Sequence, residues 1–207
     1  DDQDPTRVAS CTLSLIRDIR PGPAVLGGSP NPWLLTPGVP LLPGGAAPAY
    51  FVATTPYEGA DLWVTDGTVQ GTRLIVDSIA GVAGLDIRSI APTPAGAFVI
   101  AQYGADTIVL FADGTSSGTS VVARVHGRTA SNTSVAFGSG VVFVTEAVSS
   151  GSTTSTLSYL PSRTGSVVSL RACDGQVRHL AVAGSKFHAA CRNGASFGLV
   201  ASDGTPA

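Results

Sequence analysis

The chain has 207 residues, of which 43% are hydrophobic and 13% are charged. This hydrophobic fraction excludes general disorder, and the length allows one well-buried domain or two small ones. A formal net charge of -2 provides no basic surface for nucleic acid or an anionic membrane. No apolar run reaches the ~18 residues that a membrane helix requires. We therefore expect no nucleic-acid partner and no membrane insertion.

The composition and the order of residues are typical of an all-β protein. The chain contains 25 glycines and 14 prolines, and short β-branched runs alternate with turns that contain glycine. No long segment has the periodicity of an amphipathic helix. The sequence therefore predicts short antiparallel strands in a single domain over 1–207, with an N-terminal tail at 1–10.

The first two elements after this tail differ in character. "CTLSLIRDIRPG" contains an apolar run that predicts a strand over 12–19. Residues 21–49 hold eight of the fourteen prolines. Because proline is excluded from central strands, we expect this segment to be a surface insertion. It either packs over one face of the domain or forms part of a binding surface.

A motif then recurs along the chain. "DLWVTDGTVQGTRLIVDSI" at 61–79 is repeated as "VLFADGTSSGTSVVARV" at 109–125, so that equivalent aspartates lie 47 residues apart. A third, eroded copy is "LSYLPSRTGSVVSL" at 157–170, and a fourth begins with "LVASDGTPA" at 199–207. Units of four short strands with a period of about 45 residues are typical of propeller blades.

The two ends of the chain contain complementary parts of one unit. The fourth copy lacks a strand after its turn, and residues 12–19 read like that strand, with Thr12 placed like Thr72 and Thr119. The sequence therefore predicts a β-propeller of four blades, each with four antiparallel strands, closed by pairing of the N-terminal strand with residues 197–202. The alternative is an eight-bladed ring made of two chains. The protein is accordingly expected to be a monomer or a homodimer.

The Asp-Gly-Thr sequences predict a specific turn. We expect each aspartate to accept a hydrogen bond from the backbone N–H two residues on, while the glycine takes a positive φ. The second Gly-Thr would supply another conformational break. Because no loop has a dense ladder of Asp and Asn, we expect no cofactor; calcium bound by the aspartates is the alternative. The turn residues are Asp66, Gly67, Thr68, Asp113, Gly114, Thr115, Asp203, Gly204 and Thr205.

These turns carry a resemblance to a known family. The 61–79 copy, "SDGTPA" at 202–207 and "LIRDIRPG" at 15–22 are similar to the ELWxxDGT repeat of secreted and surface proteins from myxobacteria and other bacteria. In the first copy Leu62, Trp63, Asp66, Gly67, Thr68, Gly71 and Thr72 match the repeat, and Asp61 replaces its glutamate. The resemblance implies a β-propeller at the bacterial cell surface or in the medium. It brings no catalytic residues.

The three cysteines, Cys11, Cys173 and Cys191, suggest one disulfide and one free thiol in a secreted protein. Cys191 ends an expected strand and Cys173 precedes its hairpin partner, so we expect these two to pair. A bridge from Cys11 to either of them is the alternative and would lock the ring. The N-terminal "DDQDPTRVAS" would suit a mature N-terminus exposed after removal of a signal peptide.

Two histidines form the most unusual constellation. If Ala183 and Gly184 make a two-residue turn, His179 and His188 lie opposite each other on one face of a hairpin. Such a pair could bind a metal or a ligand, or could be packed and hydrogen-bonded without a chemical role. No third ligand is evident nearby, so no metal site is predicted.

Two Gly-x-Ser-x-Gly sequences occur, "GTSSG" at 114–118 and "GASFG" at 194–198, but each lies between two expected strands and neither opens a helix, as a nucleophile elbow does; no phosphate-binding loop is present. We therefore expect a non-enzymatic extracellular module, secreted or on the cell surface, that binds a protein or a glycan through loops of the propeller. The alternatives are a hydrolase or lyase with its site in the central channel, and a self-assembling structural protein of the surface. The candidate aromatic contacts are Trp33, Tyr50, Tyr57 and Tyr103.

Overall fold

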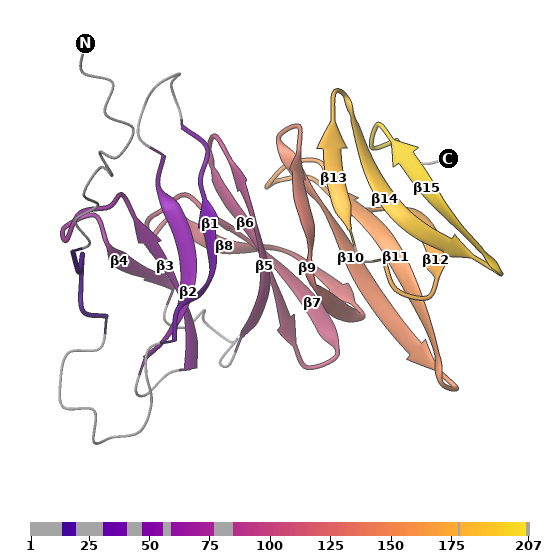
Figure 1. Cartoon of the computed structure of the whole chain (residues 1–207), viewed down its shortest axis with the longest axis horizontal. Helices are drawn as coiled ribbons and strands as arrows, with labels where there is room; N and C mark the ends of the chain where they lie inside the picture. The colour runs from indigo at the N-terminus through magenta and orange to yellow at the C-terminus, as the bar shows by residue number, and fades with distance from the viewer. Residues whose placement is uncertain are drawn as a thin grey trace, which may run out of the picture.

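A computed structural model of the chain describes residues 14–19, 31–40, 47–55, 59–76, 85–177 and 179–205. These residues contain fifteen β-strands and no helix, and within each sheet consecutive strands pair antiparallel (Figure 1). This confirms the expectation of an all-β protein built from antiparallel sheets. No helix long and apolar enough to cross a membrane occurs in the described stretches.

The strands form four sheets, each made from one continuous stretch of sequence. The first sheet contains β1 (Trp33–Pro37), β2 (Ala49–Thr55), β3 (Gly59–Thr65) and β4 (Arg73–Val76). The second contains β5 (Asp86–Thr93), β6 (Gly96–Tyr103), β7 (Asp106–Ala112) and β8 (Thr119–His126). The third contains β9 (Arg128–Phe137), β10 (Gly140–Ser149), β11 (Ser152–Leu160) and β12 (Val168–Asp174). The fourth contains β13 (Leu180–Ala183), β14 (Lys186–Asn193) and β15 (Ser196–Ser202).

The four sheets stack face to face in a row, and a separate apolar cluster lies between each neighbouring pair. The second sheet is covered on both faces, because Val99 of β6 packs toward the first sheet and Phe98 packs toward the third. This explains why β6 is a continuous apolar run without polar alternation: successive side chains point to opposite faces, and both faces are buried.

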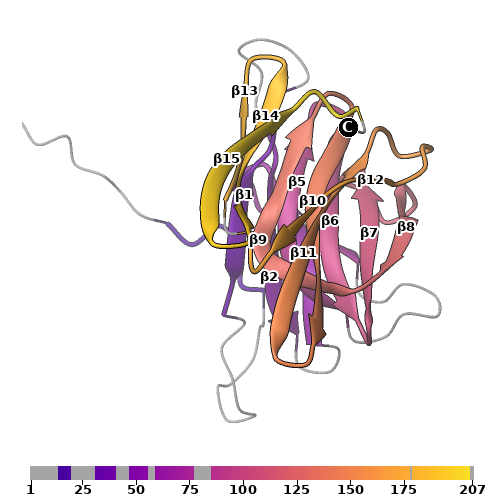
Figure 2. The ribbon, with the colours of Figure 1, turned by 90° about the vertical axis from the view of Figure 1, so that its right-hand side faces the viewer.

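The row does not close into a ring. Figure 1 shows the first and fourth sheets at opposite ends of the long axis, and Figure 2 looks along the row with the fourth sheet in front. Within the row, the first strands of successive sheets, β1, β5, β9 and β13, contact one another in turn.

The predicted closure by residues 12–19 is wrong where the structure describes them. Residues 14–19 form no strand and lie against the first sheet, where Ile19 packs with Phe51 and Trp63. Arg17 Nη1 donates to the carbonyl of Thr72 at 2.5 Å. The fourth sheet therefore keeps three strands. The apolar pattern of the segment was compatible with either sheet, and contact with the outer face of the first sheet decides its position.

The expected insertion at 21–49 is also corrected in part. Residues Trp33–Pro37 of this segment form β1, the first strand of the first sheet. β1 is an edge strand with an irregular register between Trp33 and Thr36, which is where a sheet tolerates proline-rich sequence. Residues 20–30 and 41–46 lie outside the described part of the chain.

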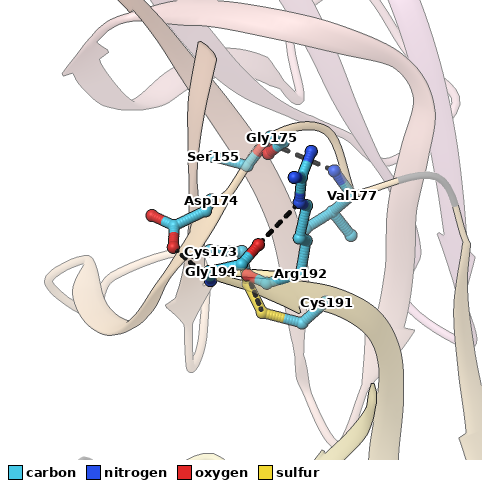
Figure 3. Close-up of a disulfide and its surroundings, with 8 residues drawn as sticks. All are labelled: Ser155, Cys173, Asp174, Gly175, Val177, Cys191, Arg192 and Gly194. Atoms are coloured by element: carbon cyan, nitrogen blue, oxygen red, sulfur yellow. Dashed lines mark hydrogen bonds between the residues drawn. A yellow bond between two sulfur atoms is a disulfide. The ribbon is translucent and has the colours of Figure 1, made fainter. Parts of the chain in front are cut away.

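A disulfide joins the third sheet to the fourth (Figure 3). Cys173 of β12 and Cys191 of β14 are bonded, with Cα atoms 5.5 Å apart, and both side chains are buried. This confirms the predicted pairing over a bridge from Cys11, which lies outside the described residues. Beside the bridge, the backbone N–H of Gly194 donates to Asp174 Oδ2 at 2.6 Å, so covalent and polar links reinforce the same junction.

We predict that replacing both bridged cysteines with alanine lowers the free energy of unfolding by about 2–4 kcal/mol, because the unfolded chain loses a cross-link. Denaturant unfolding followed by circular dichroism measures this change. The variant Cys11→Ala is the matched control, since it keeps the bridge. Equal unfolding midpoints for the double variant and the control would contradict the prediction.

Candidate functional site

The repeated Asp-Gly-Thr turns have the geometry that the sequence predicts. In the first sheet, Asp66 Oδ1 accepts from the backbone N of Thr68 at 2.9 Å and from its Oγ1 at 2.7 Å. Gly67 between them has a φ of 87°, a value that other residues rarely adopt. Thr68 Oγ1 in turn accepts from the N–H of Gly71 at 2.9 Å, which links the two halves of the motif.

The same turn recurs in two further sheets. Asp113 accepts from the N and Oγ1 of Thr115 at 2.8 and 2.7 Å, and Asp203 accepts from those of Thr205 at 3.0 and 2.6 Å. The central glycine has a φ of 93° after β7 and 90° after β15. The eroded third copy forms no such turn, yet its outer strand β12 still pairs with β11.

The second glycine of the motif provides space, which the sequence alone did not reveal. Neither Gly71 nor Gly118 has a positive φ. A Cβ at either position would instead overlap the aspartate carboxylate of the same turn, Asp66 or Asp113. The expected second conformational break is therefore a close approach between the backbone and a carboxylate. The strand after the turn, β8, pairs with β7 in a register that shifts between Val109 and Leu110.

The threonine hydroxyls lower the pKa of the turn aspartates. For Asp66, Asp113 and Asp203, hydrogen bonds from the threonine side chain and then from its backbone N–H are the largest causes. These bonds stabilise the charged carboxylate and use one of its oxygens twice. No group of three or more His, Cys, Asp or Glu side chains comes together as a potential metal site within the described stretches.

The predicted aromatic contacts that the structure describes are buried or half-buried against one apolar core. Tyr50 is 2% exposed and belongs to the core between the first and second sheets, so it is not a surface contact. Trp33 of β1 is half-buried against the same core. Tyr103, the last residue of β6, is also partly buried against this core, with the guanidinium of Arg124 5.6 Å from its ring centroid. Tyr57 lies outside the described residues.

The two histidines are not opposite each other, which corrects the expected pair. β13 and β14 pair with Ala183 next to Lys186 and Ala181 next to His188. Gly184, with a φ of 61°, takes the first central position of the turn instead of the second. This moves the register by two residues, so an alanine faces His188 and His179 falls before the start of β13.

A polar pocket of about 610 Å³ lies along the second and third sheets and the segment that leads to the fourth. It is concave, and residues from at least four strands contribute to it. The lining residues are Arg88, Gln102, Arg128, Thr129, Ala130, Thr133, Glu146, Val148, Thr153, Gln176 and Val177. We refer to it as the polar pocket.

Hydrogen bonds between sheets hold one wall of the polar pocket in place. Gln102 Oε1 accepts from the backbone N of Thr129 at 2.6 Å, which joins β6 to β9. The amide nitrogen of Gln102 donates to the carbonyls of Gly104 and Asp106 at 2.9 and 3.0 Å. Because all three bonds restrain one side chain, this wall has a fixed shape before any ligand arrives.

The charged groups of the polar pocket come from different sheets. Arg88 projects from β5, where it also forms an ion pair with Asp86. Arg128 of β9 is directly opposite Glu146 of β10. Burial raises the pKa of Glu146, and the positive charge of Arg128 partly offsets this rise. The lining thus contains two guanidinium groups and one carboxylate, and the carboxylate of Asp86 balances the charge of Arg88 from outside the lining.

The sequence did not reveal this site, because the register of the third sheet changes along the hairpin. Near its turn, Val142 pairs with Val135, which is the pairing that counting from the turn gives. Beyond an irregularity after Phe143, the pairing shifts by three residues, and this shift places Glu146 beside Arg128. Counting from the turn would pair Glu146 with Ser131 instead.

We predict that Gly118→Ala destabilises the protein by about 1–3 kcal/mol, because the new methyl group overlaps the Asp113 carboxylate and breaks the turn. Thermal unfolding measures the change. Ser116→Ala, an exposed position in the same loop, is the matched control and should shift stability by less than about 0.5 kcal/mol. Similar effects of the two substitutions would show that the second glycine has no spatial role.

The turn aspartates also predict an acid-labile contribution to stability. Their folded pKa lies below the unfolded value of about 3.9, so the stabilisation is complete above pH ~4 and is lost as the pH falls through the folded pKa. Asp113→Asn keeps an accepting oxygen but does not titrate. We therefore expect this variant to lose less stability than the wild type when the pH falls from 5 to 2.5, a range that ends about one and a half pH units below the unfolded pKa. Melting temperatures across this range provide the measurement, and parallel curves for the two proteins would refute it.

Comparison with known proteins adds no family assignment. No protein-family model matches the chain, and neither a curated protein nor a solved structure matches it. The likeness of residues 61–79 and 199–207 to the ELWxxDGT repeat thus depends on the turn residues themselves.

Proposed function

We propose that this chain is a non-enzymatic extracellular module that binds a glycan carrying a carboxylate group. The observation that carries the proposal is the polar pocket, in which Arg88 and Arg128 from two sheets converge with amide and hydroxyl groups. Its volume of about 610 Å³ falls within the usual range of ligand sites.

The chemistry of the pocket favours a glycan over a protein partner. Sugar hydroxyls need donors and acceptors side by side, and Gln176, Thr153 and Glu146 supply both kinds. A guanidinium group recognises a carboxylate through two parallel hydrogen bonds. The two guanidinium groups of the lining therefore support an acidic sugar over a neutral one. A protein interface would instead be expected to present a larger apolar and aromatic surface.

The pocket supports binding more than catalysis. Glu146 is the one carboxylate among its described lining residues, and no histidine or cysteine lines it. Glycoside hydrolysis by the usual route needs two carboxyl groups on either side of the scissile bond. The raised pKa of Glu146 is explained by its burial, which suits a group that accepts or shares hydrogen bonds with a bound sugar.

We also propose that the sheets are blades of the propeller type. Support comes from four stacked antiparallel sheets whose first strands contact one another, and from the recurrence of one turn at the same place in three of them. This arrangement agrees with the resemblance to the ELWxxDGT repeat. The buried disulfide supports an oxidising, extracellular location.

Calorimetric titration with oligosaccharides tests the binding proposal. We expect oligomers of a uronic acid to bind and the matching neutral oligomers to bind at least ~10-fold more weakly, because a charge-assisted hydrogen bond contributes about 1.5–3 kcal/mol. Arg128→Ala should weaken binding of the acidic oligomer by a similar factor. Arg171→Ala, an exposed arginine of β12 outside the polar pocket, is the matched control.

Two results would contradict the proposal. Equal affinity for acidic and neutral oligomers would remove the role of the guanidinium groups, and an unchanged affinity of Arg128→Ala would place any binding elsewhere. Shortening of the oligosaccharide during incubation, detected by mass spectrometry, would favour a hydrolase or lyase.

A further inference from the structure

The fourth sheet is incomplete at its outer edge. The first three sheets have four strands and the fourth has three, so β15 lies at an edge without a neighbour in the described chain. The turn that follows β15 is nevertheless formed, with Asp203 accepting from Thr205. In the first and second sheets the same turn leads directly into the outer strand, β4 or β8. The edge of β15 is thus prepared for one more strand.

The outer face of the fourth sheet is also uncovered. Phe197 and Leu199 of β15 point away from the third sheet and are 78% and 75% exposed. Val109 of β7 lies at the same place as Leu199, four residues before the turn aspartate, and it is fully buried against the third sheet. In the second sheet, the third sheet covers this outer face. In the fourth sheet, the corresponding face is exposed.

Residues 14–19 contact the first sheet in the way that the outer strand of one sheet contacts the next sheet in the row. Outer strands contribute to the core with the next sheet: Ile75 of β4 packs toward the second sheet, and Leu170 of β12 packs toward the fourth. Ile19 makes the equivalent contact with the outer face of the first sheet, on Phe51 and Trp63. Residues 14–19 thus lie where the outer strand of a sheet preceding the first one would lie, but they pair with no sheet among the described residues.

Hydrogen bonds to the turns repeat this relation. Arg73 of β4 donates to the carbonyl of Gly114, in the turn of the second sheet, at 2.8 and 3.2 Å. Arg17 donates in the same way to the turn of the first sheet, at the carbonyls of Val69 and Thr72. In both cases an arginine of the preceding element holds the next turn.

We propose that two copies of this chain associate head to tail. Residues 14–19 of each copy add antiparallel to β15 of the other, and the outer face of each fourth sheet packs on the first sheet of its partner. Strand addition satisfies the open backbone groups of an edge strand, and the same contact covers Phe197 and Leu199. An apolar pocket of about 350 Å³ beside Leu15, Leu35 and Phe51 is the complementary surface on the first sheet.

Two copies are the number that this geometry favours. A head-to-tail contact generates either a closed ring or an open filament, depending on the rotation between copies. Propellers close with about four to eight blades, so two rows of four sheets correspond to the largest common ring. This association uses the ends of the row and is independent of the polar pocket.

Sedimentation equilibrium of the 207-residue protein tests the association. We expect a mass of twice 20.8 kDa for the wild type and of 20.8 kDa for Leu199→Asp, which charges the outer face without touching the core. Val121→Asp, an exposed position on β8, is the matched control and should remain a dimer. A monomeric wild type at a concentration of about 100 μM, higher than the Kd of ordinary specific complexes, would overturn the proposal. An unaffected Leu199→Asp dimer or an open polymer would also overturn it.

Disulfide trapping in a Cys11→Ala background tests the direction of the contact. Leu15→Cys and Leu199→Cys are placed in separate chains and mixed under mild oxidation. We expect a cross-linked dimer in the mixture and none in either variant alone. Cross-linking of Leu199→Cys by itself would indicate a symmetric face-to-face dimer and would overturn the head-to-tail arrangement.

Discussion

The structure depends on apolar strand faces that can be covered only by a neighbouring sheet. In β6, side chains point alternately toward the first and third sheets, and both sets are buried. The second sheet therefore has no solvent face that would let it stand alone, since an isolated set of strands with two apolar faces exposes too much surface to water. At the junction with the three-stranded fourth sheet, the Cys173–Cys191 bridge adds a covalent link to this packing.

The same packing creates the candidate site. Arg88 comes from the second sheet, while Arg128 and Glu146 come from the third, so no single sheet contains the polar pocket. The hydrogen bond from Thr129 to Gln102 fixes the junction between these sheets. A site built across two packed sheets is held rigidly before a ligand binds, which lowers the entropy lost on binding. The proposed glycan site and the proposed self-association surface are therefore separate: the first lies along the row and the second at its ends.

The local features followed from the sequence because short-range chemistry determines them. Asp66 accepts from Thr68 two residues away, and Gly67 allows the positive φ that this turn needs. The bridge between Cys173 and Cys191 was the favoured pairing because both lie next to one hairpin, and the structure decided it over a bridge from Cys11. Long hairpins were less predictable. One displaced turn at Gly184 separated the two histidines, and one irregularity after Phe143 moved Glu146 to Arg128.

By itself, the sequence determined an all-β chain of short antiparallel strands and the turns that join them, because each depends on residues that are close together or on a simple alternation. It favoured the Cys173–Cys191 bridge but left a bridge from Cys11 open. Only the tertiary structure decided where residues 14–19 lie, which side chains line the polar pocket and whether the row closes. These outcomes depend on which of several similar apolar faces meet. The alternation of apolar residues is similar in the strands of all four sheets. It therefore predicts which strand faces are buried but does not identify the sheet that covers each face.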